Sequence, residues 1–280
     1  MTVKITVLCE NTTYIPETQG EHGFSAFIET DSGNYLFDTG QGDTLIDNAL
    51  SLGKDLLSLK KVFLSHGHYD HTGGLLPLLE VKKRCKIVAH PDIFLERFWI
   101  GEKDGNVVKR SIGLKHDMEA LKASGAEFLL EKKFHQVEEG LFLTGEVPRL
   151  NDFEKGDPNL FIYINGELSP DIVPDDQSLV IHTEKGKGAT VVLGCAHSGV
   201  VNILNYVRKM LNDRISCVIG GTHLASCSEE QLGKTIEALK EHDVEKIGLS
   251  HCTGAEVSLR LAEELGNRVF FGNVGISLVV

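Results

Sequence analysis

The residues that most constrain the fold are three histidines and one aspartate, which lie within the six positions from His66 to His71. The apolar residues 61–64 come just before them and predict a buried strand. The leucine-rich residues 75–79 come just after them and indicate the first turns of a helix. The pattern His-x-His-x-Asp-His therefore lies where a strand turns into a helix.

The spacing of these side chains favours the binding of two metal ions. Alternate side chains of an extended backbone point to the same side, so His66 and His68 can converge on one ion. Asp70 and His71 follow the bend, from which they can face a second ion beside the first. A histidine-rich surface turn without a metal is the weaker alternative, because histidine is scarce and this spacing follows a hydrophobic strand.

Further chemically active side chains stand at the ends of predicted strands in the second half of the chain. They are Cys195 and His197 after residues 190–193, His223 after residues 217–222, and His251 after residues 246–250. Imidazole is a commoner metal ligand than thiolate outside cysteine-rich clusters, so we prefer His197 to Cys195 as a ligand. Cys195 is kept as a second candidate, and its alternative is a buried strand cysteine. His223 is a candidate proton donor, substrate contact or ligand.

Predicted strands and helices alternate through both halves of the chain. Helices are expected over residues 43–52, 118–125, 200–211, 229–241 and 257–265, and a final strand over 269–280. The candidate site residues repeatedly fall at strand ends. We therefore expect an α/β (α+β) fold of the αββα sandwich type, in which two mixed sheets lie face to face, flanked by helices, with the metals at one edge. No repeat or linker divides the sequence, so residues 1–280 are predicted to form one domain.

Two irregular stretches are candidates for contact with a substrate. Residues 92–113 predict an inserted lid or side wall, and their Arg97, Trp99 and Arg110 would suit a planar or phosphorylated ligand. Ordinary packing and surface charge are the alternative. A long polar loop over residues 144–154 contains Arg149, and such loops are more often functional than not. We name Arg97 and Arg149 as candidate substrate-binding residues.

Two histidines are assigned to the periphery of the site. His22 lies in the loop before a strand predicted over residues 24–30, and we expect it to be exposed to solvent rather than to line the pocket. His90 ends a strand predicted over residues 87–90, and we expect a structural role or a place at the rim of the site.

Composition excludes several classes of function. A formal charge of −12 disfavours nucleic-acid binding, which requires lysine and arginine to neutralise phosphates. No apolar run approaches the length that crosses a membrane, and residues 1–8 alternate like a strand instead of forming a signal peptide. The six cysteines are scattered without a Cys-x-x-Cys pair, which argues against a structural zinc site or a disulfide framework. We expect a cytoplasmic protein with a small-molecule substrate and no nucleic-acid or membrane partner; the oligomeric state stays open.

The His-x-His-x-Asp-His pattern resembles the signature of the metallo-β-lactamase-fold superfamily, which implies the same sandwich and metal binding. The resemblance implies that His251 is the last metal ligand. It also implies that Asp38, at the end of a predicted strand, supports the metal loop from behind the ligands. Capping the following helix is the alternative role of Asp38.

Two positions depart from the usual pattern. Asp176 stands where a histidine is usual, so either Asp176 is a ligand or the ligand comes from elsewhere. Cys195 stands where a bridging aspartate is usual.

Four further strings narrow the resemblance. They are Thr-Gly-Glu-Val-Pro-Arg over 144–149, Pro-Asp-Asp-Gln-Ser-Leu-Val over 174–180, Gly-Cys-Ala-His-Ser-Gly over 194–199 and Gly-Gly-Thr-His-Leu over 220–224. Together they resemble the subfamily named for a dihydropterin–ribofuranosylaminobenzene phosphate synthase. Both departures are features of that subfamily. This resemblance implies a transferase in which the metal acts as a Lewis acid on a phosphorylated or pterin-like partner.

The leading hypothesis from the sequence is a metal-dependent hydrolase acting on a phosphoester or phosphodiester, an ester or a lactone. The ligands expected for one ion are His66, His68 and His197, and those for the other are Asp70, His71 and His251. Two ions would lower the pKa of a bound water, which Asp70 would orient, while His223 would protonate the leaving group. Two zinc ions are expected from the nitrogen-rich ligands, with manganese or iron as alternatives. The alternative function is the transferase.

Overall fold

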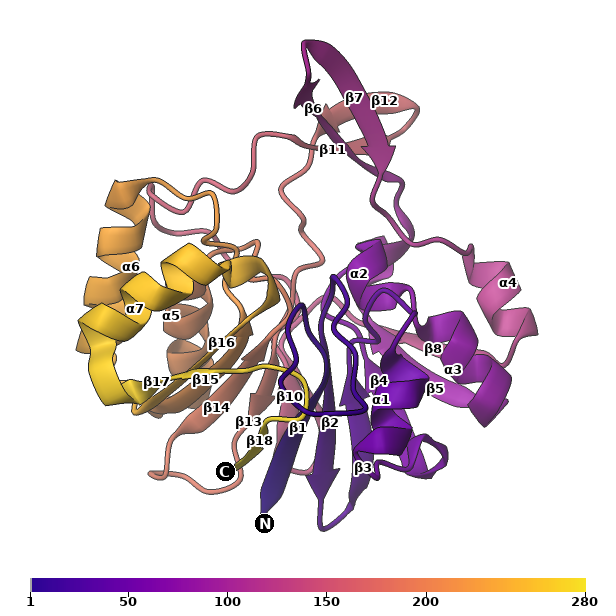
Figure 1. The fold of residues 1–280 in the computed structure, drawn as a ribbon, viewed down its shortest axis with the longest axis horizontal. Helices are drawn as coiled ribbons and strands as arrows, with labels where there is room; N and C mark the ends of the chain where they lie inside the picture. Colours follow the sequence, from indigo (N-terminus) through magenta and orange to yellow (C-terminus); the bar gives the residue numbers. More distant parts are fainter. Residues whose placement is uncertain (1) are drawn as a thin grey trace.

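In the computed structural model, which describes residues 2–280, two sheets face each other and helices cover their outer faces (Figure 1). The first sheet runs in the spatial order β18 (Ser277–Val279), β1 (Val3–Cys9), β2 (Ser25–Thr30), β3 (Gly33–Phe37), β4 (Leu59–Phe63), β5 (Cys85–Ala89) and β8 (Ala126–Leu130). The second runs in the order β17 (Val269–Phe271), β16 (Lys246–Ser250), β15 (Ile215–Gly221), β14 (Ala189–Leu193), β13 (Leu179–Ile181), β10 (Leu141–Leu143) and β9 (His135–Glu138).

Both sheets are mixed, as predicted. In the first sheet β1, β2 and β3 pair antiparallel, whereas β3, β4, β5 and β8 pair parallel. In the second sheet β14, β15, β16 and β17 pair parallel and β13 pairs antiparallel with β14. Because the chain leaves parallel strands at the same edge, residues from distant parts of the sequence meet there. The predicted αββα sandwich is confirmed.

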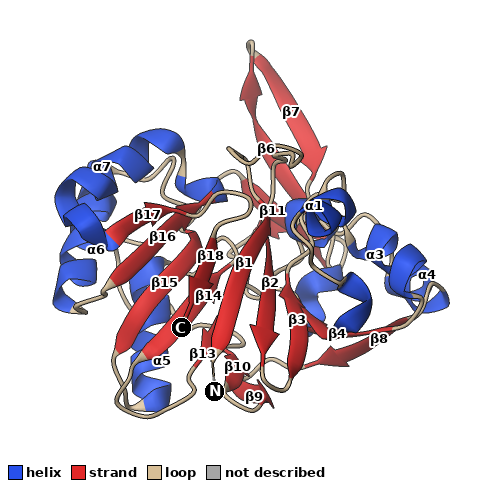
Figure 2. Cartoon of the chain, turned by 60° about the horizontal axis from the view of Figure 1, so that its bottom comes forward, coloured by secondary structure: helices blue, strands red, loops and turns tan. Residues whose placement is uncertain are grey.

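Helices form the two outer layers (Figure 2). The helices of the first half are α1 (Leu45–Ser51), α2 (Tyr69–Thr72), α3 (Leu75–Lys82) and α4 (Met118–Ala123), and those of the second half are α5 (Val200–Leu211), α6 (Glu229–Glu241) and α7 (Ala255–Leu265). Three apolar layers hold the sandwich together. One lies between the two sheets, and the other two lie between each sheet and its own helices.

Local sequence explains how these layers form. Along β1, Val3, Ile5 and Val7 belong to the apolar layer between the sheets, as the two-residue period of a strand requires. In α6, Leu232, Ile236 and Leu239 recur at helical spacing and are buried. The helix begins after Ser228, whose side chain accepts a hydrogen bond from the backbone of Gln231.

Two predictions of secondary structure are wrong. The predicted lid at residues 92–113 is not irregular, because β6 (Arg97–Lys103) and β7 (Asn106–Ser111) form a hairpin there. This hairpin joins β11 (Leu160–Ile164) and β12 (Glu167–Pro170) in a small sheet that stands above the sandwich (Figure 1). The single strand predicted over residues 269–280 is instead two short strands, β17 and β18, which belong to different sheets.

Between residues 2 and 280, none of the helices is long and apolar enough to cross a lipid bilayer. All six cysteines carry free thiols.

Candidate metal centre

The metal loop, residues 65–72, follows β4 and includes α2 at the edge where the parallel strands end. Its backbone is extended at His68, and α2 then carries Asp70 and His71. Gly67 allows close packing beneath the loop, since a Cβ there would come within 2.4 Å of the carbonyl oxygen of Ile93. The loop is therefore bent and buried as its spacing predicts.

One donor group consists of His66, His68 and His197, whose ligand atoms lie within 4.8 Å of one another. The three residues are at most 6% exposed. Burial lowers the pKa of all three imidazoles well below the usual value for histidine. They are therefore neutral, which is the form that binds metal ions.

This group has the unsatisfied polar atoms that a metal site requires. Nε2 of His68 and both ring nitrogens of His197 are buried, and they have no hydrogen-bond partner among residues 2–280. A buried polar atom without a partner costs free energy, which coordination to a divalent ion would recover. Three converging imidazoles match a borderline-soft ion such as zinc.

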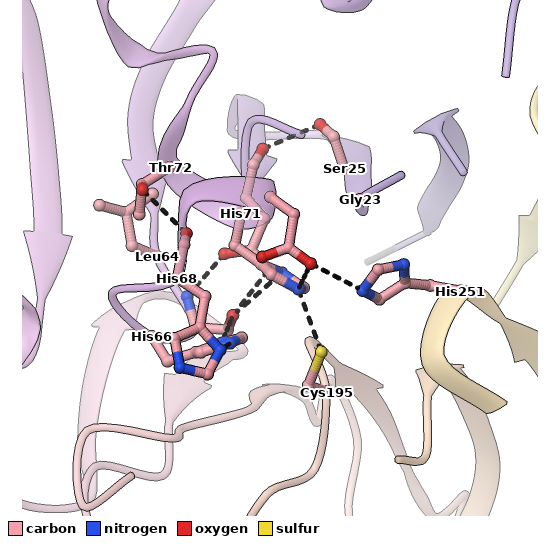
Figure 3. A network of polar contacts seen from close by, with 12 residues as sticks. Gly23, Ser25, Leu64, His66, His68, His71, Thr72, Cys195 and His251 are labelled. Carbon is pink, nitrogen blue, oxygen red and sulfur yellow. Dashed lines mark hydrogen bonds and ion pairs between the residues drawn. The ribbon is translucent and has the colours of Figure 1, made fainter. Parts of the chain in front are cut away.

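In a second donor group, His71, Cys195 and His251 lie near one another (Figure 3), and Asp70 lies beside His251. Oδ2 of Asp70 lies 3.3 Å from Nε2 of His251 and 3.3 Å from Nε2 of His22. Although burial opposes ionisation, His71 and the other neighbouring histidines hold the pKa of Asp70 well below its usual range. Nε2 of His71 lies 3.1 Å from Sγ of Cys195. The group therefore offers oxygen, nitrogen and sulfur donors to a second ion.

Asp38 lies behind this loop and orients it. Its Oδ2 accepts a hydrogen bond from Nδ1 of His71 at 2.6 Å, and its Oδ1 accepts one from the backbone of Ser65 at 2.6 Å. The bond to Nδ1 leaves Nε2 of His71 as the nitrogen that faces the site. The capping alternative is wrong, because the residue that precedes α1 is Thr44.

We predict that Asp38→Asn weakens metal binding by about 10- to 100-fold, the usual cost of losing a supporting partner of a ligand. The amide can still occupy the space, but it loses the charge that aligns His71. A competition titration of zinc against a chromogenic chelator measures the affinity. Asp43→Asn is the matched control, since Asp43 is exposed and its side chain bonds only to Gln41 within the described chain. Equal affinities of the two variants would contradict the role of Asp38.

Sequence reasoning missed Glu10 and Asn11, which hold His251 in position, and it did not place His22 in the site. Oε1 of Glu10 accepts a hydrogen bond from the backbone of His251 at 2.6 Å, and Oδ1 of Asn11 lies 2.9 Å from its Nδ1. His22 is largely exposed, as predicted, but its ring also reaches Asp70, so the preference against a pocket position was wrong. The only signal for Glu10 and Asn11 was their place at the end of the first strand.

Three predicted site residues have other contacts. Arg97, predicted to bind substrate, is fully buried and pairs with Asp171 and Asp175. Arg149 donates to the backbone carbonyls of His197 and Ile172, so it braces the loop around His197 and does not face the donor groups. Asp176, the candidate ligand, accepts hydrogen bonds from the backbone and the hydroxyl of Ser198. These predictions are corrected because each charged group is already paired within the fold.

The string around Asp176 serves the metal loop instead. Oδ2 of Asp175 accepts a hydrogen bond from the backbone of Gly67 at 2.8 Å. Nε2 of Gln177 donates to the carbonyl of Leu64 at 2.9 Å, and the backbone N–H of Gln177 donates to the carbonyl of Ser65 at 3.0 Å. The segment thus holds the histidines of the metal loop in position.

His223 lies beside His197 with 4.3 Å between their ring centroids. Its backbone has φ of 53°, in the left-handed region, and its N–H donates to Sγ of Cys252 at 3.3 Å. Both ring nitrogens are buried without a hydrogen-bond partner in the described chain. Cys252, which sequence reasoning did not single out, groups with Cys195 and His251, and all three ligand atoms lie within 4.8 Å of one another.

An outer pocket of about 360 Å³ opens over both donor groups. Its floor includes His68, Asp70 and His251, and its walls include Trp99 and Arg110 from the small sheet. The guanidinium carbon of Arg110 lies 5.8 Å from the centre of the Trp99 ring. The hairpin of β6 and β7 therefore brings an aromatic surface and a positive charge to the site.

The chain matches known proteins along most of its length. The model of the metallo-beta-lactamase superfamily matches residues 18–205. A 7,8-dihydropterin-6-methyl-4-(beta-D-ribofuranosyl)-aminobenzene-5'-phosphate synthase of Methanocaldococcus jannaschii is 33% identical over 273 residues, which are 94% of this chain and 91% of that protein. An uncharacterized protein of the same organism is 30% identical over 272 residues, 97% of this chain and 98% of that one.

Solved structures share the fold. The crystal structure of Tm1679, described as a metal-dependent hydrolase of the beta-lactamase superfamily, superposes with a TM-score of 0.82 at 30% identity and covers 99% of this chain and 98% of its own. YhfI of Bacillus subtilis, a metallo-beta-lactamase fold protein, superposes with a TM-score of 0.57 at 13% identity, and each chain is fully covered. The second likeness concerns the fold alone.

Proposed function

This chain belongs to the metallo-beta-lactamase superfamily, and we propose that it is a metal-dependent hydrolase of a small phosphodiester. The observation that carries the proposal is the pair of buried donor groups on the floor of one pocket. Arg110 is the feature that favours a phosphodiester over a neutral ester or lactone, because it places a guanidinium in the wall of that pocket.

The residues that would hold the ions follow from the donor groups. His66, His68 and His197 would bind one ion, and Asp70, His71 and His251 would bind the other, with His22, Cys195 and Cys252 beside it. When bound, the two ions would supply Lewis acidity to the phosphoryl group and to the attacking water. The nearby thiols favour zinc over manganese, because soft sulfur ligands select zinc.

The side chains around the floor would perform the remaining steps. Asp70 is held ionised and would accept a hydrogen bond from the attacking water and orient it. Arg110 would bind a non-bridging oxygen of the substrate, and Trp99 would pack against a planar group. His223, whose buried ring nitrogens have no hydrogen-bond partner among residues 2–280, would give a proton to the leaving oxygen.

A transferase is the second candidate, and the 33% identical synthase supports it. A phosphorylated aromatic substrate would use the same aromatic wall and the same arginine. The two functions differ in the nucleophile, which would be water in the hydrolase and an organic group in the transferase.

The test compares chelator-stripped protein with protein reconstituted with zinc or with manganese. We expect turnover of bis(p-nitrophenyl) phosphate only after reconstitution, together with a higher melting temperature. A metal concentration of about 100 times the dissociation constant adds about 2.7 kcal/mol to the free energy of unfolding. Absence of turnover with two ions bound per chain would overturn the hydrolase proposal. Dihydropterin binding would then test the transferase.

A further inference from the structure

A second cavity adjoins the outer pocket. This inner chamber has a volume of about 420 Å³ and lies between the loop at residues 152–158 and residues 222–231, which lead into α6. Asp157, His197 and His223 line both cavities. A substrate bound at the donor groups can therefore extend past His223 into the inner chamber.

The inner chamber is acidic. Its lining includes four carboxylates, Asp152, Glu154, Asp157 and Glu230, against a single lysine, Lys155. Two of the carboxylates are already engaged. Glu154 accepts hydrogen bonds from the backbone at the start of α5, and Glu230 pairs with Lys234 at 2.8 Å.

The other two carboxylates are available to a ligand. Oδ1 of Asp157 accepts a hydrogen bond from the backbone of Asn159 at 2.8 Å, and within the described chain neither Asp152 nor Asp157 forms an ion pair. Asp157 is half-buried, so its charge is screened less than a surface charge would be. The chamber thus presents uncompensated negative charge, whereas the outer pocket presents Arg110.

A second observation marks the boundary of the chamber as a place for a ligand. His197 is only 5% exposed, and both of its ring nitrogens lack a hydrogen-bond partner among the described residues, as do those of His223. His197 has two ring nitrogens and belongs to two groups of possible ligands, one with His66 and His68 and one with Cys195 and His223. One nitrogen can therefore bind an ion in the first donor group while the ring also lies beside His223. Unpaired polar atoms at this boundary are suited to a leaving oxygen.

Building on the proposed hydrolase, we propose that the inner chamber is the leaving-group subsite and that the leaving group is an alcohol carrying an ammonium group. The substrate would be a phosphodiester of an amino alcohol. Its phosphate lies over the donor groups, with the other ester group near Trp99 and Arg110. Its ammonium lies near Asp157 and Asp152.

The reaction that follows is a simple hydrolysis. The oxygen of water forms a bond to phosphorus, and the bond between phosphorus and the amino alcohol oxygen breaks with its electron pair. That oxygen takes a proton from His223, and the proton lost by water restores the imidazole. The products are a phosphomonoester and the free amino alcohol.

The experiment measures binding by isothermal titration calorimetry to the zinc-loaded protein. The probes are O-phosphorylethanolamine and ethyl phosphate, which differ chiefly in the ammonium group. We expect O-phosphorylethanolamine to bind at least about fivefold more tightly, the effect of one partly screened charge pair. Asp157→Asn should reduce this preference to less than about twofold. Glu237→Gln removes one exposed charge from the same α6 outside the chamber and should retain the preference.

Equal binding of the two probes, or a preference that survives Asp157→Asn in a protein with unchanged circular dichroism, would overturn the proposal. Binding requires no turnover, so these outcomes are independent of the hydrolase assay. A protein that turns over bis(p-nitrophenyl) phosphate but does not discriminate the probes would retain the proposed function and lose the amino alcohol subsite.

Discussion

Replacing Arg97 by methionine is expected to lower the free energy of unfolding by about 3–5 kcal/mol, the typical cost of removing one partner from a buried ion pair. Nε of Arg97 donates to Asp171 at 2.8 Å, and its Nη1 and Nη2 donate to the two oxygens of Asp175 at 2.9 and 2.6 Å. The arginine is fully buried and the two aspartates are nearly so. The variant would leave two buried carboxylates without a counter-charge.

The Arg97→Met substitution should also disturb the position of the metal loop, because Asp175 bonds to both Arg97 and the backbone of Gly67. Urea unfolding monitored by circular dichroism measures the change in free energy. Arg84→Met is the matched control, since Arg84 is exposed and its one ion-pair partner in the described part of the chain, Glu127, lies 3.6 Å away. That change should cost less than about 1 kcal/mol. A similar small loss for Arg97→Met would show that the ion cluster contributes little to the fold.

Arg97 also shows where sequence reasoning stops. An arginine in a polar stretch without clear periodicity is usually at the surface. Its burial depends on Asp171 and Asp175, which are more than 70 positions away in the chain. The same is true of Glu10, which contacts His251 across 241 positions. Pairings of this kind depend on how the sheets pack, and local patterns carry no information about them.

The architecture and the position of the site could be predicted because both depend on local patterns. Apolar strands that end in Gly-rich turns place His66, His197 and His251 at one edge of the sandwich, once parallel pairing is assumed. The hairpin of β6 and β7 escaped prediction because its residues other than Arg97 are half-buried or exposed, so no alternation of buried apolar residues marks the two strands. Its register depends on pairing with β11 from the other half of the chain.

Replacing Asp70 by asparagine is expected to reduce kcat/KM for bis(p-nitrophenyl) phosphate by about 100-fold or more, the scale of a lost acid–base or orienting group. Oδ2 of Asp70 lies 3.3 Å from both His22 and His251, so its negative charge sits at the centre of the second donor group. Asparagine has nearly the same shape, and the fold should persist. What is lost is an anionic oxygen that can bind an ion and orient water.

The metal content distinguishes the loss of a metal-binding carboxylate from misfolding of the protein. We expect the Asp70→Asn protein to retain the ion held by His66, His68 and His197 and to lose the other, so elemental analysis should give about half the metal of the original protein. Asp31→Asn serves as the control, because Asp31 is exposed in the turn between β2 and β3, at the opposite end of β3 from Asp38. An Asp70→Asn protein with full metal content and full turnover would contradict the assigned role. Full metal content with turnover lost would instead confine Asp70 to orienting the water, because the second ion would then be held by the neighbouring histidines and thiols.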